Sequence, residues 1–270
     1  MPEVQVRGST AKESQMKLTG LPRMFCQRRQ RETIYSEPEY WNSKALDYDA
    51  EAVSLFPNNH LNRYYHKEQL SVLESHVSNM NGASVLDVGC GTGRVSRYLA
   101  ELNATVTGID FSSGPLDIAK KLTTSGNPEY RLQSVFDLDD SNAYDLVWVC
   151  ECVTVACKNG RELLDVMLRL KRALKPSGKL LLVEPIHRGF LHRVLDMDVR
   201  EFCAVMVEAG FEIKEMTHLH FWPTKWLLAY IQWPKFITAA GYQLGDAILR
   251  LLGRKAMGDY IAICATILPG

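Results

Sequence analysis

Residues 84–93 read SVLDVGCGTG, a short apolar run that ends in three alternate glycines. The six residues that follow, RVSRYL, are typical of the first turns of a helix. A buried strand that enters a helix through glycines presents backbone N–H groups to a ligand, with no Cβ in the way. The stretch therefore predicts a strand–turn–helix unit that binds a ligand at its turn. A tight turn without a ligand is the alternative.

The spacing of the glycines decides which ligand is favoured. A dinucleotide-binding turn reads G-x-G-x-x-G, with the third glycine on the helix. Here the third position falls on Arg94 when counting starts at Gly89, and on Ser96 when it starts at Gly91. Asp87 lies two residues before the first glycine, where it would repel a pyrophosphate and attract a cation. The turn favours a cationic ligand, and a nicotinamide-dependent oxidoreductase is kept as the alternative enzyme.

Residues 85–93 closely resemble the first motif of class I S-adenosylmethionine-dependent methyltransferases. The resemblance is strongest over residues 84–185, extends over 37–265 and leaves residues 1–33 outside. It implies that Asp87, Gly89, Gly91 and Gly93 hold the amino-acid end of S-adenosyl-L-methionine. It also implies a small, hydrophobic acceptor, as in the quinone and natural-product methyltransferases. A protein that binds the cofactor without catalysis is a further alternative.

Composition narrows the class of protein further. The 270 residues carry a net charge of zero, which provides no electrostatic basis for binding nucleic acid. Seven cysteines occur without a C-x-x-C pair or a zinc spacing, so we expect no metal site and free thiols in a reducing compartment. The polar start of the chain does not resemble a secretory signal. These features predict a cytoplasmic enzyme, and they leave its oligomeric state open.

Apolar runs and amphipathic segments alternate along the chain, which predicts an α/β doubly wound, mostly parallel sheet of the Rossmann-like methyltransferase type. In such a sheet ligands bind at the carboxyl ends of the strands. Residues 259–265 match the antiparallel strand that closes the sheet in this family. We expect strands at 84–88, 104–109, 130–135, 145–150, 179–185 and 211–215, and helices at 61–80, 116–122, 161–174, 198–209 and 241–252. A turn at 175–178 should separate the helix at 161–174 from the next strand.

The chain is expected to hold one domain over residues 34–270, with helical cap elements near both ends. Residues 1–33 are polar and aperiodic, which indicates a disordered or loosely docked extension; their arginine cluster could also contact an acidic surface or belong to a targeting peptide. A helical, aromatic insert is expected at about 217–256. It either lines a pocket for a bulky apolar acceptor, docks on a membrane surface, or forms a buried cap.

Two carboxylates beyond the glycines are candidates for the cofactor site. Asp110 ends the second predicted strand, seventeen residues after Gly93, where an acid can accept hydrogen bonds from a ribose. A helix N-cap is its alternative role. Phe111 could pack on the adenine. Asp137, after the third strand, matches the acid that accepts from the adenine amino group in the family, and a solvated loop is the alternative.

The acceptor side offers fewer signals. Cys150 and Glu151 follow the fourth strand, where the resemblance implies the transferable methyl group lies. Glu151 could act as a base if burial raises its pKa, whereas the cysteines suit small buried hydrophobes. His187, after the fifth strand, is the main candidate for a general base. The other histidines that compete for the role of base are His66, His192, His218 and His220. The sequence does not distinguish methylation of an oxygen, a nitrogen or a carbon atom.

Overall fold

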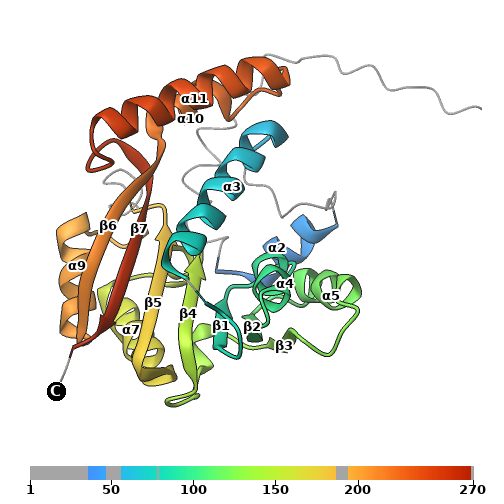
Figure 1. Cartoon of the computed structure of the whole chain (residues 1–270), viewed down its shortest axis with the longest axis vertical. Helices are drawn as coiled ribbons and strands as arrows, with labels where there is room; N and C mark the ends of the chain where they lie inside the picture. Colours follow the sequence, from blue (N-terminus) through green and yellow to red (C-terminus); the bar gives the residue numbers. More distant parts are fainter. Residues whose placement is uncertain (1–35, 47–55, 78, 187–193, 269–270) are drawn as a thin grey trace, which may run out of the picture.

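The computed structural model describes residues 36–46, 56–77, 79–186 and 194–268 (Figure 1). The extension predicted at residues 1–33 and the candidate base His187 lie outside the described residues, as does His192.

A seven-stranded sheet forms the centre of the molecule, in the order β3-β2-β1-β4-β5-β7-β6. Strands β1 to β5 run parallel, and β7 pairs antiparallel with both β5 and β6. This confirms the predicted doubly wound, mostly parallel sheet with an antiparallel closing strand. The strands are β1 (Ser84–Val88), β2 (Thr105–Asp110), β3 (Glu129–Leu132), β4 (Tyr144–Cys150), β5 (Leu174–Glu184), β6 (Phe211–Phe221) and β7 (Gly258–Ile267).

Helices cover both faces of the sheet, because alternate side chains of each strand point to opposite faces. In β1, Leu86 and Val88 pack with α7 (Gly160–Ala173) and α9 (Val199–Glu208), whereas Val85 packs with α3 (Asn59–His76) and α4 (Arg94–Glu101). Asp87 shares the second face with Val85, and therefore points toward α4. The sheet alternation thus decides where the motif carboxylate lies. The remaining helices are α2 (Pro38–Ala45), α5 (Ser113–Leu122), α6 (Val153–Ala156), α10 (Trp222–Leu228) and α11 (Lys235–Leu251).

Three predicted strand boundaries differ from the structure by several residues, and helix α11 begins at Lys235 rather than at residue 241. Strand β3 ends at Leu132, because residues 135–137 form a 3-10 turn that the Ser134 hydroxyl caps. The residues predicted as a turn at 175–178 are a bulge within β5: Leu174 pairs with Tyr144, and pairing resumes at Lys179. Strand β6 continues to Phe221, well beyond the predicted 215, because it pairs along nearly the whole of β7.

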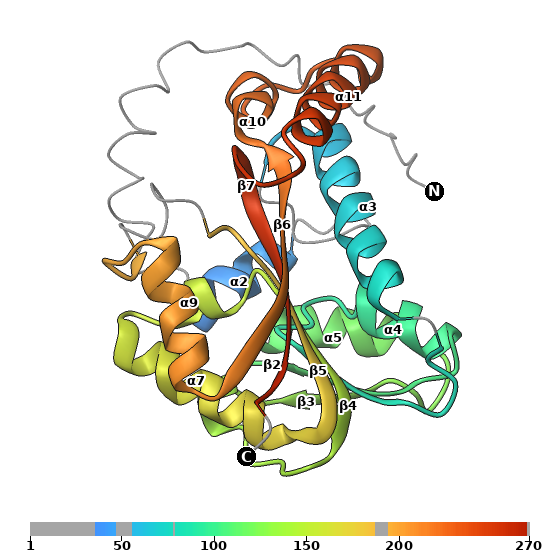
Figure 2. The ribbon, with the colours of Figure 1, turned by 60° about the vertical axis from the view of Figure 1, so that its left-hand side comes forward.

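Helices α10 and α11 lie across one end of the molecule, next to α3 (Figure 2). They account for most of the predicted insert. Asn58 joins the two parts: its side chain accepts from the first turn of α3 and donates to the Leu228 carbonyl (3.0 Å) and the Thr238 hydroxyl (3.2 Å). No helix in the described part of the chain is both long and apolar enough to cross a membrane.

Candidate active site

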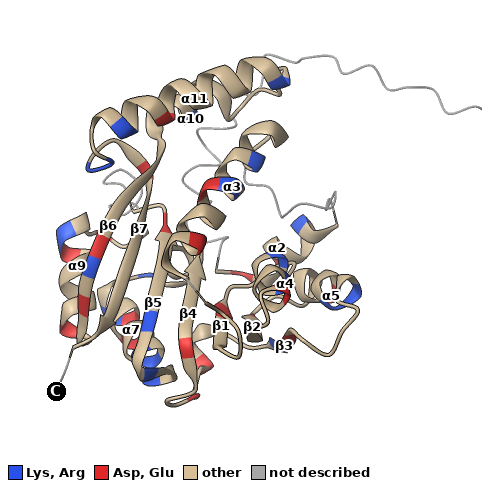
Figure 3. Ribbon diagram, viewed as in Figure 1, with Lys and Arg blue, Asp and Glu red and all other residues tan. Residues whose placement is uncertain are grey.

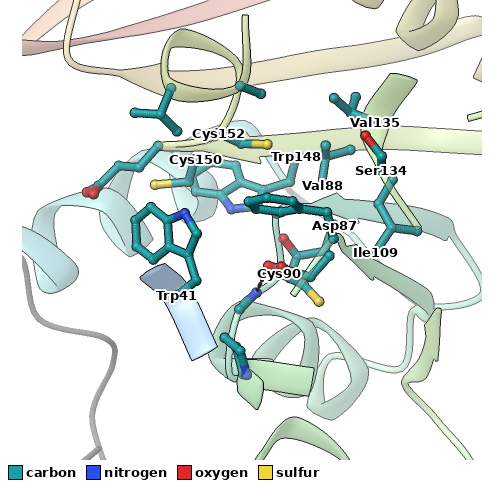
Figure 4. Close-up of a pocket in the computed structure, with 18 of the residues that line it drawn as sticks. Trp41, Asp87, Val88, Cys90, Ile109, Ser134, Val135, Trp148, Cys150 and Cys152 are labelled. Carbon is teal, nitrogen blue, oxygen red and sulfur yellow. Dashed lines mark hydrogen bonds between the residues drawn. The ribbon is translucent and has the colours of Figure 1, made fainter. Parts of the chain in front are cut away.

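A cavity of about 500 Å³ lies at the carboxyl ends of β1, β2 and β4 (Figure 4). Most of the predicted site residues line it, although they are spread over 65 positions of the sequence. They are Asp87, Gly89, Gly91, Asp110, Phe111, Cys150 and Glu151. Gly93 and Asp137 are not among its lining residues.

The glycine turn closes one wall of the cavity in a backbone conformation that favours glycine. Gly89, Gly91 and Gly93 have φ values of +70°, +54° and +71°. A Cβ on Gly89 would lie 2.8 Å from that of Cys152, and one on Gly93 would lie 2.2 Å from the Tyr130 hydroxyl oxygen. A Cβ on Gly91 would meet no heavy atom within 4 Å. Two glycines therefore permit packing of the fold, and Gly91 leaves its backbone open to the cavity.

Asp87 supplies a buried carboxylate to the same wall. Its Oδ2 accepts a hydrogen bond of 2.5 Å from the Ser96 hydroxyl of α4. Burial raises the pKa of Asp87 to about 6, an effect that the Ser96 hydrogen bond opposes. A cationic ligand group beside Asp87 would stabilise the ionised form. This carboxylate suits the ammonium group of an amino-acid ligand.

Asp110 links the second strand to the glycine turn. Its two carboxylate oxygens accept from the Gly91 N–H and the Ser112 N–H, both at 2.9 Å. The N-cap position of α5 is Ser112, so Asp110 does not serve as the helix cap that was its alternative role. Burial raises the pKa of Asp110, and the backbone donors oppose that shift. The arrangement holds an acceptor at the cavity wall where ribose hydroxyls could donate.

The predicted position of the third acid is not on the cavity wall. Gln133, Ser134 and Phe136 line the cavity, whereas Asp137, the last residue of the 3-10 turn, is not among its lining residues. The Gln133 side chain donates to the Asp137 carbonyl at 3.0 Å, which holds the turn. Asp137 as the adenine contact therefore stays a prediction, and it is an exposed residue next to the cavity-lining Phe136.

Glu184, for which the sequence predicted no role, anchors the loop after β4. Its buried carboxylate accepts from the N–H groups of Cys152 (2.7 Å), Val153 (2.9 Å) and Thr154 (3.3 Å), and from the Thr154 hydroxyl (2.5 Å). Burial raises the pKa of Glu184 to about 7 although these donors oppose the shift. The carboxylate from β5 thereby positions the start of α6 against the cavity. No local sequence pattern could reveal a contact across 30 residues.

Glu151 lines the cavity in a left-handed backbone conformation (φ +56°). Its Oε1 accepts from the Gln69 side chain of α3 at 2.8 Å. Burial raises the pKa of Glu151, as a base at this position requires. His66 also lines the cavity, but burial lowers its pKa to about 3, so its imidazole is neutral at physiological pH.

Cysteines and aromatic residues complete the cavity. Burial raises the pKa of the Cys150 and Cys152 thiols well above the usual range, so both stay protonated. Trp41 of α2 also lines the cavity (Figure 4). Helix α2 is docked there by Asn42, whose side chain accepts from the Gly114 N–H at 2.8 Å.

Comparison with known proteins supports a methyltransferase. Residues 85–178 match the family model described as a methyltransferase domain. The chain is 31% identical to Methyltransferase GfsG of Streptomyces halstedii, over 48% of each chain. It is 37% identical to the ubiquinone biosynthesis O-methyltransferase of Xanthomonas oryzae, over 37% of this chain and 42% of that protein. The chain thus spans less than half the length of these two curated relatives.

The fold is shared with solved methyltransferase structures. An S-adenosylmethionine-dependent methyltransferase from Mesorhizobium loti superposes with a TM-score of 0.52 at 16% identity. The superposition covers 73% of this chain and 96% of that one. At this identity the likeness establishes the fold, and the site rests on the residues described above.

Proposed function

We propose that this chain, which belongs to the class I S-adenosylmethionine-dependent methyltransferases, transfers a methyl group to a small hydrophobic acceptor. The acceptor class we propose is a quinone, a natural product or a lipid-like molecule. The observation that carries the proposal is the joint placement of Asp87, the Gly91 backbone and Asp110 on one cavity wall.

These residues fit S-adenosyl-L-methionine by charge and by hydrogen-bonding capacity. Asp87 would offset the charge of the ammonium group, and Asp110 would accept from the ribose hydroxyls. Phe111 would pack on the adenine, with Gln133 and Ser134 as polar neighbours in place of Asp137. When bound, the cofactor supplies a methyl group on a positively charged sulfur.

Glu151 is the proposed base for an acceptor that must lose a proton. Gln69 orients its carboxylate, and the raised pKa of Glu151 makes it a stronger base than an exposed glutamate. Alignment of the acceptor atom with the methyl carbon supplies much of the rate by proximity alone. His187 is retained as a second proposed base, because it comes three residues after the last residue of β5 in the sequence.

The apolar side chains at the cavity support a hydrophobic acceptor. Trp41, Phe136 and Trp148 line it. The name of one curated relative points the same way, since it is a ubiquinone biosynthesis O-methyltransferase. The zero net charge of the chain provides no argument for a nucleic-acid acceptor.

Calorimetric titration with S-adenosylhomocysteine tests the cofactor site. The intact chain should bind, and Asp110→Ala should weaken binding at least tenfold, because it removes the ribose acceptor and the bond to Gly91. Asp117→Ala, an exposed acid on α5, is the matched control and should bind normally. Absence of binding by the intact chain, or normal binding by Asp110→Ala, would refute the cofactor site.

Transfer of a radiolabelled methyl group into cell extracts fractionated by polarity tests the acceptor. Label should enter the apolar small-molecule fraction, and label found only in protein or nucleic acid would refute this acceptor class.

Once the acceptor is identified, Glu151→Gln should lower kcat while S-adenosylhomocysteine still binds. Unchanged turnover of His187→Ala across the pH range would remove His187 as a base.

A further inference from the structure

We propose that the outward face of α11, together with the neighbouring α10, docks on the surface of an anionic lipid bilayer. This docking does not depend on methyl transfer. We call the exposed apolar residues of 222–257 the cap surface.

An apolar stripe runs along the outward side of α11. Phe236, Leu244 and Leu251 are 74%, 64% and 87% exposed. Ala240 and Ala247 lie between them and are also exposed, so the stripe follows helical spacing of three and four residues. The buried side of the same helix contains Thr238, Gly245 and Leu249. Helix α11 therefore presents apolar residues away from the core that it packs on.

Exposed apolar residues are concentrated at this end of the molecule. Among the described residues, ten of the 18 large hydrophobic side chains that are exposed fall within residues 222–257. A concentration of this kind marks an interaction surface rather than ordinary surface composition. Tryptophan suits the boundary between water and lipid, because its ring is apolar and its N–H is polar. The ten are Trp222, Trp226, Leu227, Ile231, Phe236, Ile237, Leu244, Leu251, Leu252 and Met257.

The charged residues around the cap surface favour an anionic partner. Residues 222–257 contain five basic residues and one acid, a net charge of +4 in a chain whose total is zero. Lys225 and Arg254 are paired with carboxylates of the fold, and the exposed Arg250 pairs with Asp246 of its own helix, whereas Lys235 and Lys255 are exposed at either end of the segment. Figure 3 shows α11 with basic residues at its two ends and mostly uncharged residues between. Basic groups that flank an apolar helix face are complementary to anionic headgroups above acyl chains.

The stripe is held in a fixed orientation on the fold. Tyr242, on the inward side of α11, donates to Glu68 of α3, and Arg254 joins Glu68 to Asp246. A helix held along its length in this way lies flat on a surface rather than crossing a membrane. A second copy of the chain is a less suitable occupant, because it would bring two sets of basic residues together.

Co-sedimentation of the full-length chain with vesicles tests the proposal. Vesicles of phosphatidylcholine with about 30% phosphatidylglycerol should retain the protein, and pure phosphatidylcholine vesicles should retain much less. Each basic residue near an anionic bilayer contributes roughly fivefold in affinity. Lys235→Glu/Lys255→Glu should therefore reduce binding to the anionic vesicles by at least tenfold. Lys120→Glu/Lys121→Glu, on α5, is the matched control and should bind as the wild type does.

A triple change to serine at Phe236, Leu244 and Leu251 should reduce retention at least tenfold. The matched control is the triple serine variant of Leu122, Leu132 and Leu168, which are exposed elsewhere. Thermal melting and S-adenosylhomocysteine binding should be unchanged in both variants, which separates docking from folding and from the proposed function.

Three outcomes would overturn the proposal. The first is a wild-type chain that stays in solution with both kinds of vesicle. The second is a control triple variant that loses as much binding as the stripe variant. The third is a wild-type dimer, measured by light scattering, that becomes a monomer in the stripe variant without any retention by vesicles, because a second copy would then cover the cap surface.

Discussion

The three glycines of the first motif should respond differently to alanine, although all have positive φ. Alanine in the left-handed region costs about 1–2 kcal/mol. Gly93→Ala adds a methyl group 2.2 Å from the Tyr130 hydroxyl oxygen and 2.9 Å from the Ala119 Cβ, an overlap that costs about 1–3 kcal/mol more. The methyl group of Gly91→Ala meets no heavy atom within 4 Å, so this variant should lose only the free energy that the left-handed backbone conformation costs. We therefore expect the free energy of unfolding to fall by about 2–5 kcal/mol for Gly93→Ala and by about 1–2 kcal/mol for Gly91→Ala.

Ligand binding should reverse this order for the variants that remain folded. The Gly91→Ala methyl group would enter the cavity where a ligand approaches the backbone, so affinity for S-adenosylhomocysteine should fall at least tenfold. Gly82→Ala is the matched control, because Gly82 has φ +76°, no neighbour within 4 Å and no place in the cavity. The free energy of unfolding of Gly82→Ala should fall by the cost of the left-handed backbone conformation, and its affinity for S-adenosylhomocysteine should be normal. Urea unfolding and calorimetry measure both quantities, and normal ligand affinity in Gly91→Ala would refute the reasoning.

Three further changes test the buried charges. The pKa of Asp87 is raised to about 6, so its ionisation destabilises the unliganded fold by about 3 kcal/mol as pH rises from about 4 to 6. Asp87→Asn should remove this loss, and identical pH profiles of unfolding for the wild type and the variant would contradict the reasoning. Glu184→Gln replaces an acceptor oxygen by an NH₂ group, so thermal melting should reveal a loss of about 1–3 kcal/mol for each donor left unpaired, and an unchanged melting temperature would be inconsistent with the anchoring role. Arg254→Met leaves the Glu68 and Asp246 carboxylates without their shared partner and should cost about 3 kcal/mol in urea, whereas Arg250→Met, at a 72% exposed side chain, should cost less than about 1 kcal/mol.

Several features could be predicted because they depend on neighbouring residues. The glycine turn requires positive φ at three positions, and only the residues of the turn itself supply that freedom. Asp110 ends an apolar strand, so its place at the sheet edge follows from the strand pattern. The amphipathic helix at 161–174 was predicted from its periodicity and the closing strand at 259–265 from the family resemblance, and the structure has them as α7 and β7.

Other features depend on which segments meet. The pattern predicted β6 only to residue 215, because the part up to Phe221 is extended by pairing with β7 rather than by its own composition. The 3-10 turn at Val135–Asp137 was missed because apolar residues alone do not distinguish it from the end of a strand, and the adenine contact of Asp137, which the family resemblance implies, stays a prediction.

The sequence by itself determined the class of fold, through the alternation of strands and helices along the chain, and the glycine turn and the acid of the second strand, because these two depend on neighbouring residues. Only the tertiary structure decided that Glu184 anchors the loop of Glu151, and that Gln69 of α3 orients that carboxylate. It also decided that α11 presents an apolar stripe outward, since an amphipathic pattern does not say which side a neighbour covers. These contacts join segments 30 to 82 residues apart, and the energy that selects them comes from packing of the whole chain.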